Sequence, residues 1–288
     1  MQISFLCGPE PISQYRNPAL VVAHPGHELK VFGWLHASAP RVYVLTDGSG
    51  GGTPRLSSTT RLLNQAGAVP DEFFGPISDA EVYRAILEKR IPIFLGIVDE
   101  LAASFARNGI DFVAGDATEG FNPTHDICRA LVNAAVAIAE RVNRRIIANY
   151  EFCLTEWEQH CREIHDQRCL HLRLEDRLLD SKLASAAEYT ELKKEIEQAI
   201  ALRGEEYFRV ECLRKVTDPF PELEALAKPY YELFGEARVA QGKYGAVIRY
   251  EQHMLPLLQA VRSHALEITA VPDTLLASNG AAGQPLLL

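Results

Sequence analysis

A short apolar run that ends abruptly in two histidines constrains this chain more than any other feature. Residues 19–23 read as a fully buried parallel strand, and residues 29–36 read as a helix. The turn between them is His-Pro-Gly-His and carries His24 and His27. This turn is therefore predicted at the carboxyl end of a strand, where open α/β sheets bind their ligands.

Strands and helices alternate along the chain through residue 152. Buried strands are predicted, after the first, at residues 41–46, 110–114 and 144–152. Helices are predicted between them at residues 57–68, 79–90, 97–108 and 127–142. This alternation predicts an α/β fold with a doubly wound, mostly parallel sheet.

The character of the sequence changes after residue 152. Residues 175–202 form a long charged tract of helical pattern, and residues 205–214 continue in the same style. We therefore expect three parts: an α/β core at 1–152, a mainly helical cap or extension at 153–267, and a tail at 268–288. Residues 1–17 are expected to be an irregular lead-in beside the sheet.

Composition excludes several classes of function. The net charge of −9 and the absence of a basic stripe argue against a nucleic-acid partner. No apolar run is long enough to span a membrane, and the first residues lack the features of a signal peptide, so we predict a cytoplasmic protein. The six cysteines show no C-x-x-C spacing, and we interpret them as free thiols. The glycine-rich loop at 47–52 lacks a P-loop lysine, which favours the wall of a cleft over a nucleotide site.

A third histidine is predicted at the same edge of the sheet. The strand at 110–114 leads into a polar loop with Asp116 and Glu119, and His125 follows at the start of the next helix. Three neutral imidazoles suit Zn²⁺ or another divalent transition metal and leave a fourth position for water or substrate. The alternatives to metal binding are a helix-capping role for His24 and simple surface exposure for His27.

Three motifs together resemble a known family. Residues 21–28, 44–48 and 122–125 read V-V-A-H-P-G-H-E, V-L-T-D-G and N-P-T-H. In this order and at these distances they resemble the PIG-L or LmbE-like zinc-dependent sugar de-N-acetylases, which have a Rossmann-like sheet and the motifs A-H-P-D-D-E, T-x-G and H-P-D-H. The resemblance covers about the first 150 residues, and we find no family motif in the C-terminal half.

The resemblance implies a metal site built from the three histidines. His24 matches the family's first ligand and His125 its last. His27 stands where the family has a ligating aspartate, so a neutral ring replaces a carboxylate. A Zn²⁺ ion with three neutral ligands keeps its full charge, which lowers the pKa of its bound water to about 7.

The same comparison shows which catalytic groups are missing. Gly26 stands where the family has its general base. Asn122 replaces the first histidine of H-P-D-H, and Thr124 replaces the aspartate that orients neighbouring ligands. Asn122 retains the capacity to donate a hydrogen bond to an oxyanion. General acid–base help, worth about 10²–10⁴-fold, must come from elsewhere.

Carboxylates near the strand ends are the candidates for this proton transfer. We favour Glu119 or Asp116 as the base, because neither has an obvious structural role in a loop of small residues. For the other candidates a structural role is an alternative to proton transfer. An acid in the first turn of a helix interacts favourably with the helix dipole, and an aspartate can brace a loop through an Asx-turn. These other candidates are Glu28, Asp47, Asp126 and, more remotely, His253.

The sequence thus predicts a metal-dependent hydrolase that removes an acyl group from an N-acylated amino sugar or a related small amide. Its partner would be this small-molecule substrate. Two alternatives stay open. One is a catalytically impaired homologue that binds a sugar or a metal in the same cleft. The other is a different metal-dependent reaction at a three-histidine centre.

Overall fold

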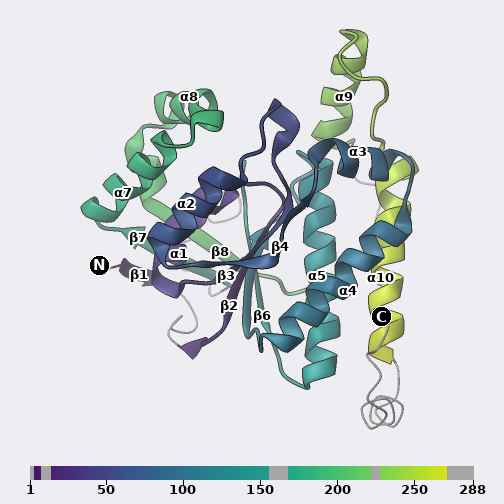
Figure 1. Cartoon of the computed structure of the whole chain (residues 1–288), viewed down its shortest axis with the longest axis horizontal. Helices are drawn as coiled ribbons and strands as arrows, with labels where there is room; N and C mark the ends of the chain where they lie inside the picture. Colours follow the sequence, from purple (N-terminus) through teal and green to yellow (C-terminus); the bar gives the residue numbers. More distant parts are fainter. Residues whose placement is uncertain (1–2, 8–13, 156–167, 222–227, 271–288) are drawn as a thin grey trace.

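The computed structural model describes residues 3–7, 14–155, 168–221 and 228–270. Within them the strands form one eight-stranded sheet in the order β1-β7-β8-β6-β5-β2-β3-β4 (Figure 1). Five of these strands pair in parallel: β2 (Pro18–Val22), β3 (Arg41–Thr46), β4 (Val69–Ile77), β5 (Phe112–Asp116) and β6 (Ala148–Phe152). The predicted Rossmann-like α/β fold with a mostly parallel sheet is confirmed.

Strand β2 lies at the centre of the parallel part of the sheet. Its five residues are all buried, because helices cover both faces of the sheet and neither face of the strand is exposed to water. The chain moves outward from β2 through β3 to β4 on one side, and from β5 to β6 on the other. The order therefore reverses between β2 and β5, and a crevice at the carboxyl ends of these strands is the usual ligand site of such sheets.

Helices pack on both faces of the sheet (Figure 1). One apolar core includes side chains of α3 (Asp79–Leu87), α4 (Ile91–Arg107), α5 (Pro123–Asn143) and α10 (Leu255–Ala270). The core on the other face includes α1 (Phe32–Ser38), α2 (Leu56–Ala66) and α7 (Asp176–Ala187). The remaining elements are α8 (Lys193–Arg203), α9 (Tyr230–Ala240), the short 3-10 helices η2 (His27–Val31), η3 (Ser49–Gly51), η4 (Thr190–Leu192) and η5 (Glu205–Arg209), and the π-helix η6 (Tyr250–Met254).

Several predicted elements were wrong or missing. The supposed lead-in contains β1 (Ile3–Cys7), and the segment predicted as helix at 205–214 ends in β8 (Val210–Lys215). Together with β7 (Cys169–Leu174), these strands extend the sheet by antiparallel pairing. Strand β4 was missed because two prolines and a glycine weaken its pattern, which is tolerated at a sheet edge. The sheet thus continues beyond residue 152, and the division into a core and a helical cap stays a prediction.

Two further sequence predictions concern cysteines and membranes. Cys128 and Cys153 are buried free thiols, whereas Cys212 is disulfide-bonded, so the prediction of six free thiols was wrong for Cys212. Sequence spacing could not reveal this bond, because Cys212 lies on a strand that was predicted to be helical. Among the described helices, none is sufficiently long and apolar to cross a membrane. The cytoplasmic location stays a prediction.

A buried carboxylate on strand β8 forms an ion pair with α7 and hydrogen bonds with the start of α1. Glu211 accepts hydrogen bonds from the backbone N–H groups of Gly33 and Trp34 at 2.8 and 3.1 Å and pairs with Lys182 at 2.8 Å. The side chains of Glu211 and Lys182 are only 0% and 7% exposed. The carboxylate therefore satisfies both a buried cation and the N-terminal amides of a helix.

Replacing Glu211 by alanine is expected to lower the free energy of unfolding by about 3–5 kcal/mol, because Lys182 is left as an unpaired buried charge. Urea denaturation measures this loss. The double variant Glu211→Leu/Lys182→Met removes both charges and is expected to recover part of the stability. Equal losses in the single and double variants would show that the ion pair is not the cause.

Candidate metal centre

The three predicted histidines lie together at the crevice between β2 and β5. His24 follows β2, His27 begins η2, and His125 lies in the first turn of α5. Their ring centroids are 5.3 Å apart for His24 and His27, 5.1 Å for His24 and His125, and 4.7 Å for His27 and His125. All three rings are therefore in mutual contact.

His24 is held by partners from two other elements. Its Nδ1 lies 2.7 Å from Thr46 Oγ1, at the end of β3, and 2.9 Å from Asp79 Oδ1, at the start of α3. Although burial alone would raise it, the pKa of Asp79 lies below its usual range because of its bonds to His24. An ionised carboxylate only accepts hydrogen bonds, so Nδ1 of His24 carries the proton.

The other ring nitrogen of His24 is left with a lone pair. Nε2 is buried and has no hydrogen-bond partner. Burial also lowers the pKa of His24, so the ring is neutral at pH 7 despite the hydrogen bond that its Nδ1–H donates to Asp79. A buried lone pair without a donor is costly, and a metal ion or a substrate donor would satisfy it.

His27 is oriented in the same manner by Asp116. The Nδ1 atom of His27 lies 2.8 Å from Oδ2 of Asp116, which also accepts the backbone N–H of Ala23 at 2.7 Å. Asp116 is 1% exposed, and its Oδ1 has no hydrogen-bond partner. Strand β5 ends at Asp116, two residues beyond the predicted end, and this places the carboxylate directly beneath the His24–His27 turn.

His125 is positioned by the start of α5. Asn122 is the N-cap, with Oδ1 accepting the backbone N–H of Thr124 at 2.8 Å, and Pro123 occupies the first helical turn. His125 is 6% exposed, and its Nδ1 has no hydrogen-bond partner. Burial, followed by the charges of His27 and His24, lowers the pKa of His125 well below its usual value, so this ring is also neutral.

The donor chemistry of this cluster fits a divalent transition metal. The cluster offers imidazole nitrogens, two of them buried without partners, and each of the two turn histidines is oriented by a carboxylate, as metal-ligating histidines usually are. As placed, however, no three His, Cys, Asp or Glu side chains among the described residues could together hold a metal ion. Binding therefore requires these rings to turn so that their nitrogens face one point.

Gly26, where the resemblance places a general base, has a backbone conformation that would strain a side chain, and a leucine side chain lies beside it. Gly26 has φ +106°, and a Cβ added there would lie 2.4 Å from Cδ1 of Leu192. Leu192 belongs to η4, far along the chain. A carboxylate at position 26 would therefore be strained by the backbone conformation and would require the end of the Leu192 side chain to move.

Glu28 is part of the structure that holds this turn. It is fully buried, its Oε2 accepts the backbone N–H of Gly26 at 2.7 Å, and its Oε1 accepts a short hydrogen bond from the Tyr189 hydroxyl. The Tyr189 hydroxyl also lies 2.8 Å from Oγ1 of Thr59. Burial raises the pKa of Glu28. These bonds tie the turn to α2 and to the C-terminal half of the chain.

The two other loop acids have structural partners. Glu119 accepts hydrogen bonds from the backbone N–H groups of Leu154 and Thr155 at 2.8 and 3.0 Å and from the Thr155 hydroxyl at 2.6 Å. Asp126 accepts the backbone N–H groups of Glu119 and Gly120, and burial raises its pKa to about 7. Glu119 thus braces the loop after β6, a role that the sequence did not indicate.

The remaining candidates also show local structural roles. Asp47 accepts the backbone N–H of Ser49 at 2.9 Å, the Asx-type bond that the sequence offered as its alternative. His253 lies in the π-helix η6, and its Nδ1 accepts the backbone N–H of Arg249 at 2.8 Å. Both residues are thereby explained without a part in the chemistry.

Arg55 is a site residue that sequence reasoning missed. A Cβ added to Gly48 would lie 2.8 Å from Nε of Arg55 and 3.0 Å from Pro25, so the guanidinium stands beside the histidine turn. Nε of Arg55 is buried and has no hydrogen-bond partner. Its position just after the glycine-rich loop, at the start of α2, was the available signal.

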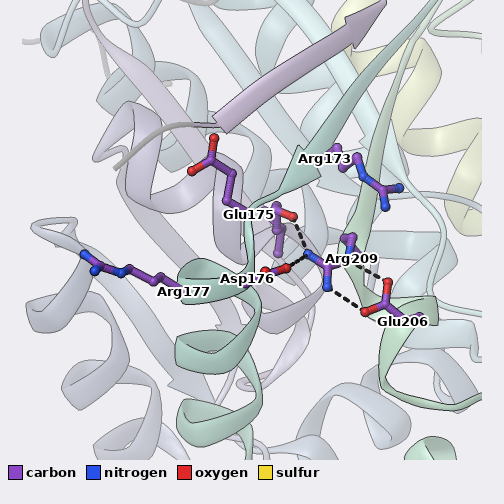
Figure 2. Close-up of a pocket in the computed structure, with 7 residues that line it drawn as sticks. Arg173, Glu175, Asp176, Arg177, Glu206 and Arg209 are labelled. Carbon is purple, nitrogen blue, oxygen red and sulfur yellow. Dashed lines mark hydrogen bonds and ion pairs between the residues drawn. The ribbon is translucent and has the colours of Figure 1, made fainter.

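A hollow lies elsewhere on the protein. It has a volume of about 580 Å³ and is lined by residues of β7, α7 and η5 (Figure 2). Within it Arg209 pairs with Glu206 and Asp176, and it also bonds the backbone carbonyl of Leu174. Its lining includes none of the three histidines, and its charges neutralise one another. We therefore place the candidate site at the histidines and not in this hollow.

Comparison with known proteins gives little to identify the chain. No family model matches it, and no curated protein matches it. Two solved structures of the teicoplanin deacetylase Orf2 are similar, each at 9% identity over 70% of this chain. The zinc-inhibited form matches over all of its own length with a TM-score of 0.47, and a triple mutant matches over 99% with 0.48. Values at this level do not establish membership of a family.

Proposed function

We propose that this protein is a metal-dependent hydrolase that removes an acyl group from an N-acylated amino sugar or a related small amide. The observation that carries the proposal is the cluster of three histidines in mutual contact, two of them with a buried ring nitrogen that lacks a partner. His24, His27 and His125 would hold the ion. A bound Zn²⁺ supplies Lewis acidity and an activated water.

The surrounding residues would prepare the site for this chemistry. Asp79 and Asp116 orient His24 and His27 through their Nδ1 atoms and keep the opposite nitrogen free to bind. The side-chain NH₂ of Asn122 and the guanidinium of Arg55 are the donors available to an oxyanion, since Oδ1 of Asn122 is used as the helix cap.

Of the two predicted bases, Asp116 is better supported than Glu119. Both oxygens of Glu119 already accept hydrogen bonds from the loop after β6, whereas Oδ1 of Asp116 has no partner. Asp116 also contacts His27 directly. We therefore assign the proton-accepting role to Asp116 and a bracing role to Glu119 and Glu28.

The alternative, a homologue that binds a sugar or a metal without cleaving an amide, is favoured by one observation. Gly26 stands where the resemblance places the base, so this group is absent, and Leu192 lies in the space that a side chain there would need. The two functions differ in a single measurable outcome, which is amide cleavage by the metal-loaded protein.

The decisive experiment compares metal-free and zinc-loaded protein, purified without a histidine tag. We expect about one Zn²⁺ per chain and acyl release from N-acetylated sugars that stops on chelation and returns with Zn²⁺. Matched O-acetyl esters test the preference for amides. Zinc binding without release of any acyl group would favour the binding alternative, and the absence of metal after incubation with Zn²⁺ would exclude the hydrolase.

A further inference from the structure

Four aromatic rings form a continuous row on the surface, which we call the aromatic row. Phe121 stacks on Tyr230 with centroids 5.0 Å apart and planes 1° from parallel. Tyr230 contacts Phe234 at 6.0 Å, and Phe234 contacts Tyr244 at 6.3 Å. The four side chains are between 39% and 50% exposed. So much exposed aromatic surface in one line is unusual unless a ligand covers it.

The aromatic row begins at the candidate metal centre. Phe121 directly precedes Asn122, the N-cap of the helix that carries His125. The backbone N–H of Tyr231 donates to the carbonyl of Gly120 at 3.2 Å, so the start of α9 is bonded to this same loop. The first ring of the row thus belongs to the loop that leads into the helix carrying His125.

The other end of the row lies near α3. Burial, then the charges of Tyr244 and Asp79, raise the pKa of the Tyr83 hydroxyl on α3. Asp79 is also the hydrogen-bond partner of His24. Helix α9 stands above α3 and α5 at one end of the molecule (Figure 1). The row therefore extends from the β5–α5 loop toward α3, and both flank the histidines.

The chemistry of the row suits ring-shaped ligands with both apolar and polar groups. Aromatic faces carry partial negative charge and attract C–H groups, which sugar rings present on one face. The Arg238 guanidinium lies 5.3 Å from the Phe234 ring and 5.7 Å from the Tyr244 ring, and its Nε has no hydrogen-bond partner. Arginine and tyrosine thus add groups that bond hydroxyls beside the apolar faces.

We propose that the aromatic row binds additional sugar rings of the substrate, so that the protein acts on an oligosaccharide or glycoconjugate of several rings. This inference rests on the proposed function, because it takes the histidine cluster as the place where the terminal sugar reacts. The row continues directly from the loop at that cluster, and this continuity favours the substrate itself over a separate partner.

The test uses N-acetylglucosamine oligomers of one to four rings as probes. For the zinc-loaded protein we expect kcat/KM to rise about tenfold or more from one ring to three, as stacking on successive aromatic rings adds affinity. Phe234→Ala and Tyr244→Ala are each expected to reduce the ratio of kcat/KM for three rings to kcat/KM for one ring toward one. Leu233→Ala is the matched control, since Leu233 is 50% exposed on the same helix but outside the row, and its ratio should equal that of the parent.

Binding to metal-free protein separates this inference from the proposed function. In calorimetric titrations of the parent protein, the N-acetylglucosamine trimer should bind more tightly than the monomer. In Phe234→Ala this difference in affinity should disappear. Binding of the trimer without hydrolysis would support sugar binding by the aromatic row and would contradict the proposed hydrolase function. Equal kcat/KM and equal affinity for oligomers of all lengths would contradict the inference that the aromatic row binds sugar rings. A dimer in sedimentation that Phe234→Ala converts to a monomer would also contradict it.

Discussion

His125→Ala is expected to reduce bound zinc from about one ion per chain to none and to abolish amide hydrolysis. His125 is the ligand contributed by α5, so its loss leaves only the two histidines of the turn. Losing one of three ligands should cost more than the 10–100-fold in affinity that is typical when an orienting partner is removed. Elemental analysis and zinc competition with a chromophoric chelator measure the effect.

Two further variants make this test specific. Asp116→Asn keeps all three histidines but weakens the orientation of His27, so we expect an intermediate loss of affinity of about 10–100-fold. His253→Ala alters a buried histidine whose Nδ1 accepts the backbone N–H of Arg249, and it should leave the zinc content unchanged. If His125→Ala retained stoichiometric zinc with the fold intact, the metal centre proposed here would be wrong.

Gly26→Ala is expected to lower the free energy of unfolding by about 2–5 kcal/mol. Part of this, about 1–2 kcal/mol, comes from placing a Cβ at φ +106°. The rest comes from the 2.4 Å approach of that Cβ to Leu192, since forcing an extra group into a packed site costs about 1–3 kcal/mol. Urea denaturation with thermal unfolding as a second probe measures the total.

The chain offers a close control for this prediction. Gly52 has φ +108°, but a Cβ there would meet nothing within 4 Å, so Gly52→Ala measures the backbone strain alone. In the double variant Gly26→Ala/Leu192→Ala the packing contribution should disappear, with the loss due to position 26 falling to that of Gly52→Ala. Equal losses for Gly26→Ala and Gly52→Ala would show that Leu192 yields without cost.

The position of Leu192 beside Gly26 also matters for a carboxylate introduced at position 26. Gly26→Asp would place a carboxylate where the resemblance locates the base, yet Leu192 occupies the space that its side chain needs. Tyr189, three residues before Leu192, bonds Glu28 on the same turn. Leu192 and Tyr189 thus pack against the turn that carries Gly26 and Glu28.

Local sequence pattern determined the centre of the fold. The run of buried residues before His24 has to form a strand covered on both faces, because it contains no polar side that could face water. The alternation with helices then predicts a parallel sheet, and a parallel sheet brings its carboxyl ends to one edge. For that reason His24, His27 and His125 were predicted at the same edge before any contact between them was known.

Only the tertiary structure decided what each side chain at that edge does. Asp79 bonds His24 across 55 positions, Asp116 bonds His27 across 89, and Tyr189 bonds Glu28 across 161. Periodicity reports which face of an element is buried, but it carries no information on which distant segment covers that face. The pairing of β8 beside β6 and the contact of Leu192 with Gly26 are of this kind, and so the roles of Glu119, Arg55 and Gly26 emerged only from packing.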